Sequence, residues 1–260
     1  MAVAVPDILA RIVGHKRSQL ARASAHLADL ERRAADRPAA RDFRAALMAS
    51  PPAIIAEIKQ ASPSKGVFTD DFQPAALAKC YQAGGAGALS ILTDEEFFKG
   101  KLADLEAARS AVAVPVLRKD FTIHEFHIVE AAAHGADAIL LIAAILDGQQ
   151  LREFRELAAR YGMAALVEVH DDYELDAALD SGADMVGVNN RNLHTFEVTL
   201  DTSLRLAEKM PDAVVKIAES GIHSRADVQR LQAAGFHAFL VGEHLMKSAD
   251  PAAALRELRS

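Results

Sequence analysis

The sequence has little of what several classes of protein require. Its one cysteine, Cys80, excludes an internal disulfide and a thiolate metal cluster, and we expect it to be a small core residue. No apolar run approaches the length that crosses a membrane. The first residues also lack the basic segment and continuous apolar run of a secretory signal. These absences predict a soluble, cytoplasmic protein.

An excess of positive charge is missing too. The chain has 29 Lys and Arg against 36 Asp and Glu, with a net charge of -7 and a pI near 5.8. Such a balance gives no general attraction to nucleic acid or to an anionic membrane. An acidic ligand must therefore be met by a local positive site. The ten histidines form no H-E-x-x-H or comparable spacing, so the sequence predicts no metal site.

What the chain does contain is enough apolar material for a large core. Of its 260 residues, 51% are hydrophobic, which argues against disorder. This length suits one large domain or two modest ones, and α/β barrels routinely occupy it as a single domain. Because no change in composition marks a linker, we expect one domain over residues 1–260.

Short apolar runs alternate with amphipathic stretches along most of the chain. Residues 5–36 have helical spacing and come before any strand. The predicted strands are 53–59, 88–93, 115–118, 138–143, 164–169, 185–189, 214–219 and 238–242. The predicted helices between them are 74–83, 102–111, 124–134, 148–160, 172–181, 201–209 and 225–234. Several helices end in a glycine step such as HGADA or SGADM, where glycine supplies a left-handed cap.

Eight such βα units of nearly continuous apolar character predict parallel strands covered on both faces. The fold class is therefore α/β, and we expect a closed (βα)8 TIM barrel over about residues 51–260, with an N-terminal helical extension over about 1–50. A doubly wound open sheet is the alternative. It usually has a glycine-rich nucleotide motif after its first strand, and the SPSKG segment matches neither that motif nor a P-loop.

The first strand and the loop after it carry an unusual charge pattern. In AIIAEIKQASPSKG, Glu57 and Lys59 are two residues apart, so a strand would direct both side chains to the same face. If that face is the inside of a barrel, the two charges must be paired or used, because burying them alone costs free energy. A solvated edge strand with an incidental ion pair is an equal alternative. SPSKG reads as a mobile loop that brings Ser62 and Pro63 over a ligand.

Nearly every predicted strand ends in an ionisable or hydrogen-bonding residue. Active sites of α/β barrels lie at the carboxyl ends of the strands. Chance explains one or two polar ends, whereas a whole ring is better explained by a shared site. The ring comprises Glu57, Lys59, Lys119, Glu168, Asn189, Glu219, Ser220 and Gly242.

Two glycines suggest a phosphate ligand. The seventh unit closes as AESGI and the eighth as LVGEHLM, so Gly lies where the chain leaves each strand. Barrels frequently bind phosphate between these two loops and a short helix. The amides of Ser220, Gly221, Gly242 and Glu243 fit that function. Either motif alone is also compatible with an ordinary tight turn.

Lys119 in LRKDF and Glu168 in LVEVH offer the two halves of proton-transfer chemistry. Burial of Lys119 near other cations would lower its pKa towards neutrality, and a facing carboxylate could accept a proton. An ion pair that braces the rim is the alternative for these two residues. We expect the neighbouring His170 to face solvent.

Taken together, these motifs resemble the indole-3-glycerol-phosphate synthase family. The resemblance runs from the N-terminal helices to Met246 through AEIKQASPSKG, LRKDF, ADAILLIAAIL, LVEVH, VGVNNRNL, AESGI and LVGEHLM. It implies a carboxy-lyase of tryptophan biosynthesis. The implied substrate is 1-(2-carboxyphenylamino)-1-deoxyribulose 5-phosphate, a sugar phosphate that is cyclised, decarboxylated and dehydrated to indole-3-glycerol phosphate. No cofactor and no metal are implied, and we expect a monomer.

The resemblance also implies functions for single residues. Lys119 is the expected general acid, and Glu168 is its partner in the later dehydration. Lys59 is expected to bind the substrate's anionic groups, and either Lys59 or Lys119 is expected to act at the dehydration step. The remaining implied residues orient these groups (Glu57, Asn189), support the carboxylate (Arg191), bind phosphate (Ser220, Gly221, Gly242, Glu243), cover the ligand (Ser62) or form the apolar pocket (Pro63, Phe98, Phe121, Leu140, Leu193).

Two other functions are compatible with a phosphate-binding barrel. One is a related enzyme such as phosphoribosylanthranilate isomerase or the tryptophan synthase α subunit. The isomerase typically has Cys and Asp as its acid and base at the ends of the first and third units, where this chain has Glu57 and Lys119. The other is a barrel without catalytic activity that serves as a scaffold or regulator.

Overall fold

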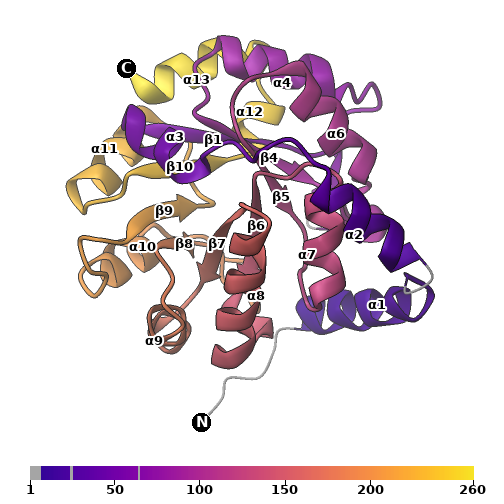
Figure 1. Ribbon diagram of the computed structural model, residues 1–260. Helices are drawn as coiled ribbons and strands as arrows, with labels where there is room; N and C mark the ends of the chain where they lie inside the picture. The colour runs from indigo at the N-terminus through magenta and orange to yellow at the C-terminus, as the bar shows by residue number, and fades with distance from the viewer. Residues whose placement is uncertain (1–6, 24–25, 64) are drawn as a thin grey trace.

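A closed barrel of eight parallel strands forms the centre of the computed structural model, which describes residues 7–23, 26–63 and 65–260 (Figure 1). Pairing of the last strand with the first closes it. The barrel strands are β1 (Ala53–Ile58), β4 (Ala88–Leu92), β5 (Val116–Lys119), β6 (Ala138–Ile142), β7 (Ala164–Val169), β8 (Met185–Asn189), β9 (Val215–Glu219) and β10 (Ala238–Val241). All eight predicted strands are confirmed, each to within one residue at either end.

The seven helices predicted between the strands are also confirmed, and they surround the barrel (Figure 1). They are α4 (Pro74–Ala83), α6 (Leu102–Ala111), α7 (Glu125–Ala133), α8 (Gly148–Arg160), α9 (Asp172–Asp180), α10 (Asp201–Ala207) and α11 (Arg225–Ala233). Gly135 and Gly182, after α7 and α9, both have a φ of 84°, the left-handed conformation expected there. No helix in the described ranges is long and apolar enough to cross a membrane.

Several short elements were not predicted. They are the hairpin of β2 (Ala61–Ser62) and β3 (Gly66–Val67), the helices α5 (Glu95–Phe98), α12 (Glu243–Met246) and α13 (Pro251–Arg259), and the 3-10 turn η2 (Ala143–Ile145). Most consist of two to four residues, too few to show a period. Ser64 in the predicted first loop, residues 5–6 and residues 24–25 lie outside the described residues.

The N-terminal extension consists of α1 (Asp7–Ala23), α2 (Leu27–Ala35) and α3 (Phe43–Ala49). Helix α1 lies at the carboxyl ends of the strands, where Leu9 and Ile12 line a cavity. Helix α2 packs against α7 (Figure 1). Helix α3 covers the amino-terminal ends, where Phe43 and Leu47 join the barrel interior. The extension therefore contacts both ends of the barrel.

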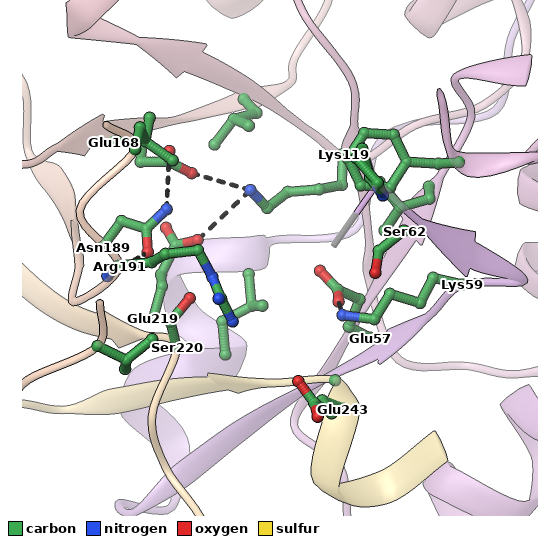
Figure 2. Close-up of a pocket in the computed structure, with 18 of the residues that line it drawn as sticks. Glu57, Lys59, Ser62, Lys119, Glu168, Asn189, Arg191, Glu219, Ser220 and Glu243 are labelled. Atoms are coloured by element: carbon green, nitrogen blue, oxygen red, sulfur yellow. Dashed lines mark hydrogen bonds and ion pairs between the residues drawn. The ribbon is translucent and has the colours of Figure 1, made fainter. Parts of the chain in front are cut away.

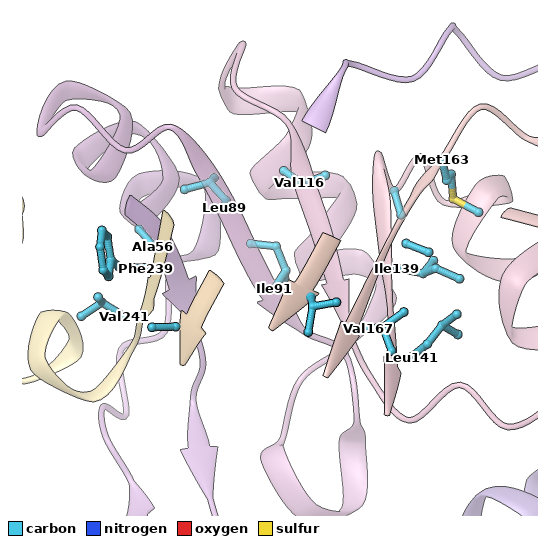
Figure 3. Close-up of a cluster of buried hydrophobic side chains, with 14 of the residues drawn as sticks. Ala56, Leu89, Ile91, Val116, Ile139, Leu141, Met163, Val167, Phe239 and Val241 are labelled. Atoms are coloured by element: carbon cyan, nitrogen blue, oxygen red, sulfur yellow. The ribbon is translucent and has the colours of Figure 1, made fainter. Parts of the chain in front are cut away.

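Alternation along the strands produces two apolar layers. Outward residues such as Leu89, Ile91 and Val167 pack beneath the helices (Figure 3). Inward residues fill the barrel itself, among them Ile55, Leu117, Leu166, Ile217 and Leu240. The next inward position on several strands, two residues further on, is charged or polar. The period of two thus sets a polar layer directly on top of an apolar one.

A buried carboxylate joins the extension to the barrel. Asp137 precedes β6 and is fully buried. Its Oδ1 accepts hydrogen bonds from the backbone N–H of Arg41 at 2.9 Å and from the Arg109 guanidinium at 3.1 Å, and its Oδ2 accepts one from the Val116 N–H at 2.9 Å. The Arg37 guanidinium lies 3.8 Å away. Three segments therefore depend on one side chain for buried hydrogen-bond acceptors.

Asp137→Ala should lower the free energy of unfolding by about 3 kcal/mol, because it leaves buried donors and a buried cation without a partner. Urea unfolding followed by circular dichroism measures this. The matched control is Asp36→Ala, at an exposed position just after α2, which should change the free energy by less than about 0.5 kcal/mol. Equal effects of the two substitutions would contradict the anchoring function of Asp137.

Candidate active site

A cavity of about 440 Å³ opens at the carboxyl ends of the barrel strands. It lies where the sequence predicts the site, and every predicted site residue lines it. These residues are Glu57, Lys59, Ser62, Pro63, Phe98, Lys119, Phe121, Leu140, Glu168, Asn189, Arg191, Leu193, Ser220, Gly221, Gly242 and Glu243. Their separation in sequence spans almost the whole barrel, so only the closed fold brings them together.

Lys119 lies at the centre of the charged groups in this cavity (Figure 2). As the last residue of β5, it extends inward and donates a hydrogen bond from Nζ to Glu168 Oε2 at 2.8 Å. Its Nζ is also 3.5 Å from Glu219 Oε2, at the end of β9. Asn189, at the end of β8, donates from Nδ2 to the other Glu168 oxygen at 3.2 Å. Side chains from the ends of β5, β7, β8 and β9 thus form one network centred on this ammonium group.

The predicted direction of the Lys119 pKa was wrong. Burial by itself would lower this pKa, but Glu168, Glu219 and Glu57 outweigh burial and raise it above the usual value. Lys119 is therefore held as a cation. Burial would likewise raise the pKa of Glu168, but Lys119 and His170 lower it well below its usual range. Lys119 and Glu168 form a charged pair, which on geometry alone is compatible with both catalysis and bracing.

Glu219 completes the cluster; the sequence places it in the ring of strand ends but assigns it no function. Burial, opposed by Lys119 and reinforced by Glu168 and Glu57, raises the pKa of Glu219 to about 8. Its Oε1 is buried and has no hydrogen-bond partner in the described part of the chain. A Cβ on Gly187 would lie only 2.2 Å from that oxygen, so the glycine of β8 makes room for it. The sequence signal for Glu219 is its position at the end of a predicted strand, in AESGI.

Buried Glu57 and partly buried Lys59 form an ion pair in the barrel cavity, so the edge-strand alternative is wrong. Glu57 is 6% exposed, and Lys59 donates to Glu57 Oε1. The Lys59 ammonium also lies 5.4 Å from the centre of the Phe68 ring. A Cβ on Gly242 would be 2.2 Å from Glu57 Oε1 and 2.9 Å from Lys59 Nζ. The pair therefore occupies the space that a side chain at 242 would need.

The loop after β9 has the backbone shape expected near an anion. Ser220 and Gly221 both have positive φ, 66° and 78°. A Cβ on Gly221 would lie 2.6 Å from Val198 Cγ1, so the loop after β9 closely approaches the segment after β8. The Glu243 carboxylate is engaged by lysines, with Lys247 Nζ at 2.6 Å and Lys65 Nζ at 3.6 Å. These ion pairs lower the pKa of Glu243, Lys247 being the largest cause.

One side of the cavity is apolar. Phe98 from α5 and Phe121 after β5 have ring centroids 6.1 Å apart, and Leu140 extends from β6. Residues that the sequence did not predict add further apolar surface to the cavity, namely Ile8, Leu9, Ile12, Phe196 and Val198. The sequence of α1 did not predict that this helix lines the cavity, because an amphipathic pattern shows that one face is buried without showing what covers it.

A second charged network lies behind the Lys119 strand. Lys16 from α1 places Nζ 3.0 Å from Asp94 and 2.6 Å from Asp120, all three side chains being buried. Asp120 also pairs with Arg118 at 3.1 Å. Burial would raise the pKa of Asp120, but Arg118 and Lys16 lower it. The two residues that flank Lys119 are thus fixed, and α1 is tied to them.

Two further predictions concern histidine and metal. His170 does not face solvent as predicted, because its side chain is 12% exposed and its Nε2 lies 3.3 Å from Glu168 Oε1. Within the residues that the structure describes, no group of three or more His, Cys, Asp or Glu side chains could hold a metal ion. The lysine and glutamate side chains that line the cavity can perform acid–base and electrostatic chemistry.

Comparison with a solved structure supports the fold. A thiamine phosphate pyrophosphorylase from Pyrococcus furiosus superimposes with a TM-score of 0.58 and 16% sequence identity. The match covers 80% of this chain and 94% of that one. At this identity the likeness concerns the barrel architecture alone.

Sequence comparison is more specific. The chain is 50% identical over 258 residues to the indole-3-glycerol phosphate synthases of Albidiferax ferrireducens and Chromobacterium violaceum. The matches cover 97% of this chain and 98% and 97% of those proteins, respectively. The family model for indole-3-glycerol phosphate synthase matches residues 9–258, from within α1 to within α13. This chain therefore belongs to the indole-3-glycerol phosphate synthase family.

Proposed function

We propose that the charged cluster around Lys119 carries out the family's reaction in this chain. Members of the family are carboxy-lyases of tryptophan biosynthesis. The reaction converts 1-(2-carboxyphenylamino)-1-deoxyribulose 5-phosphate into indole-3-glycerol phosphate, carbon dioxide and water. The main support is the position of Lys119 Nζ between Glu168 and Glu219, in one cavity with the Glu57–Lys59 pair (Figure 2).

Lys119 is the general acid of ring closure in this proposal. The aromatic carbon that bears the carboxylate attacks the carbonyl carbon of the ribulose chain, and negative charge develops on the carbonyl oxygen. A fixed ammonium stabilises that charge and supplies the proton. The raised pKa of Lys119 keeps it protonated near neutral pH, before the substrate arrives.

The apolar wall serves the loss of carbon dioxide. Phe98, Phe121, Leu140, Leu193 and Pro63 line one cavity with the charged groups and offer a surface for the aromatic ring. The bond to the carboxylate breaks, carbon dioxide leaves, and the electron pair returns to the ring. Transfer of the carboxylate from water to this wall favours its departure. Arg191, whose backbone N–H donates to Asn189 Oδ1 at 3.1 Å, lies nearby to bind the carboxylate beforehand.

Dehydration uses the remaining charged groups. The hydroxyl formed from the carbonyl leaves as water after it receives a proton, and a proton is lost from the new ring. We assign the base to Glu168 and the donor to Lys59, which Glu57 holds in place. Asn189 orients Glu168 through the hydrogen bond from its Nδ2. A positioned acid or base of this kind contributes about 10²- to 10⁴-fold to a rate.

Backbone amides of Ser220, Gly221, Gly242 and Glu243 bind the phosphate in this proposal. The positive φ values at Ser220 and Gly221 support it, because successive amides in such a turn can converge on an anion. The pairing of Glu243 with Lys247 and Lys65 supports it too, since those lysines offset a carboxylate that would otherwise repel phosphate. Ser62, in the β2–β3 hairpin, lines the same cavity as a covering residue. That the protein is a cytoplasmic monomer built as a single domain stays a prediction.

Lys119→Met should lower kcat by at least about 100-fold, because it removes the proton donor and keeps a similar volume. Product formation can be followed by indole fluorescence, which is free of overlap because the chain has no tryptophan. Lys79→Met, at an exposed position on α4, is the matched control and should retain the wild-type kcat. A kcat for Lys119→Met within twofold of wild type would rule out this function of Lys119.

Glu219 should make ligand binding dependent on pH. Its raised pKa means that it is neutral below about pH 8 and gains a negative charge above it. The Kd for indole-3-glycerol phosphate should therefore increase as the pH passes about 8, because a new anion faces an anionic ligand. Fluorescence titrations from pH 6.5 to 9.5 measure this.

In Glu219→Gln the increase in Kd near pH 8 should be absent, because glutamine does not ionise. Glu208→Gln, at an exposed position after α10, is the control and should keep it. If Glu219→Gln shows the same increase as wild type, the titrating group is not Glu219.

A further inference from the structure

His170 lies directly after β7, with its imidazole between two carboxylates. Nδ1 is 2.9 Å from Glu174 Oε2, and Nε2 is 3.3 Å from Glu168 Oε1. The side chain is 12% exposed. A chain of contacts thus runs from Glu174 on α9 through His170 to Glu168 and on to Lys119.

Glu174 is held firmly at the far end of this chain of contacts. Its Oε2 also accepts a hydrogen bond from the backbone N–H of His170 at 2.8 Å. Its own N–H donates to Asp171 Oδ1, which caps the start of α9. Because an ionised carboxylate only accepts hydrogen bonds, the Nδ1 of His170 must carry the hydrogen of this contact. The second nitrogen, Nε2, is left facing Glu168.

The environment of Nε2 favours a second proton. This nitrogen is buried and has no well-aligned hydrogen-bond partner in the described residues, so its main neighbour is the Glu168 carboxylate. A lone pair there would face a negative charge, whereas an N–H would be attracted to it. Burial lowers the pKa of His170, but Glu168 and Glu174 together raise it to about 10.

The groups that surround His170 agree with this charge state. The titratable side chains that face its ring are Glu168 from β7 and Glu174 from α9. The turn η2, which packs against both elements, contributes only Ala143, Ala144 and Ile145. His170 is therefore a cation held between two anions.

We propose that His170, supported by Glu174, is a positioning residue that keeps Glu168 ionised and oriented throughout the reaction. The inference rests on the proposed function of Glu168 as a base. Lys119 is the other cation bonded to Glu168, and it gives up its proton during ring closure. At that stage Glu168 would lose its counter-charge and become a competitor for protons. A second cation that does not enter the reaction prevents this, since it stabilises the carboxylate form of Glu168.

Two substitutions of His170 test whether its charge, rather than its hydrogen bonds, serves this function. In His170→Asn the amide can replace Nδ1–H towards Glu174, and in His170→Gln it can extend towards Glu168, but neither side chain carries a charge. Both should lower kcat by about 10- to 100-fold with KM within about twofold. Removal of a cation raises the pKa of Glu168, so the acid limb of the kcat–pH profile should move to higher pH in both variants.

Glu174→Gln tests the same relay, the chain of contacts from Glu174 through His170 to Glu168, without altering His170. It keeps an acceptor oxygen and removes the charge, so the pKa of His170 should fall and the alkaline limb should move to lower pH. The matched control is His134→Asn. His134 makes a similar contact, from Nδ1 to Glu106 at 2.8 Å, but does not line the cavity. Its kcat and pH profile should equal those of wild type.

The outcomes distinguish this inference from the proposed function. Turnover by wild type and its loss in Glu168→Gln test the proposed function alone. Suppose that wild type turns over and Glu168→Gln does not. The inference is then overturned if the normalised pH profiles of the His170 variants superimpose on that of wild type, whatever their kcat. A reduced kcat with unshifted limbs indicates a merely structural contribution. Shifted limbs in His170→Asn and His170→Gln, with His134→Asn unchanged, support the relay.

Discussion

The structure depends on the attraction between one buried ammonium group and the carboxylates around it. Lys119 lies between Glu168 and Glu219, and the three side chains come from β5, β7 and β9. Burial of any one of these charges alone would cost several kcal/mol. Each charge is therefore stable only in the presence of the others. The cluster has more carboxylates than cations, and the raised pKa of Glu219 favours its protonated, neutral form. The closed barrel meets this requirement because it brings separate strand ends to one point.

The same strands supply both the support and the chemistry. Leu117, Leu166 and Ile217 fill the barrel, and Lys119, Glu168 and Glu219 follow them two residues later on the same face. Packing at the lower level fixes the height and direction of the charges at the upper one. Glycines adjust the fit: Gly187 leaves space for Glu219, and Gly242 leaves space for the Glu57–Lys59 pair.

Much of the fold and of the site's location was predictable because the sequence patterns that indicate them are local and repeated. The strands and connecting helices follow from period and length, and a polar residue at each strand end predicts a shared site once a closed barrel is inferred. Charge states were harder. The pKa of Lys119 was predicted to fall because the sequence shows burial but does not show that two carboxylates meet it. The prediction that His170 faces solvent failed because the sequence does not show that its side chain, directly after β7, lies against Glu168. The position of α1 over the cavity depends on contacts that Lys16 makes with Asp94 and Asp120, which are distant in the sequence.

Those long-range contacts have a consequence for the order in which the protein is assembled. Helix α1 is made first, yet Asp94 and Asp120, which hold Lys16, are made only after much of the chain has followed. During synthesis α1 must wait for β4 and β5 before it has a place to bind. The wall that it contributes to the cavity is therefore completed late, from the earliest part of the chain. Until then Leu9 and Ile12, which are buried in the folded protein, lack the residues that cover them.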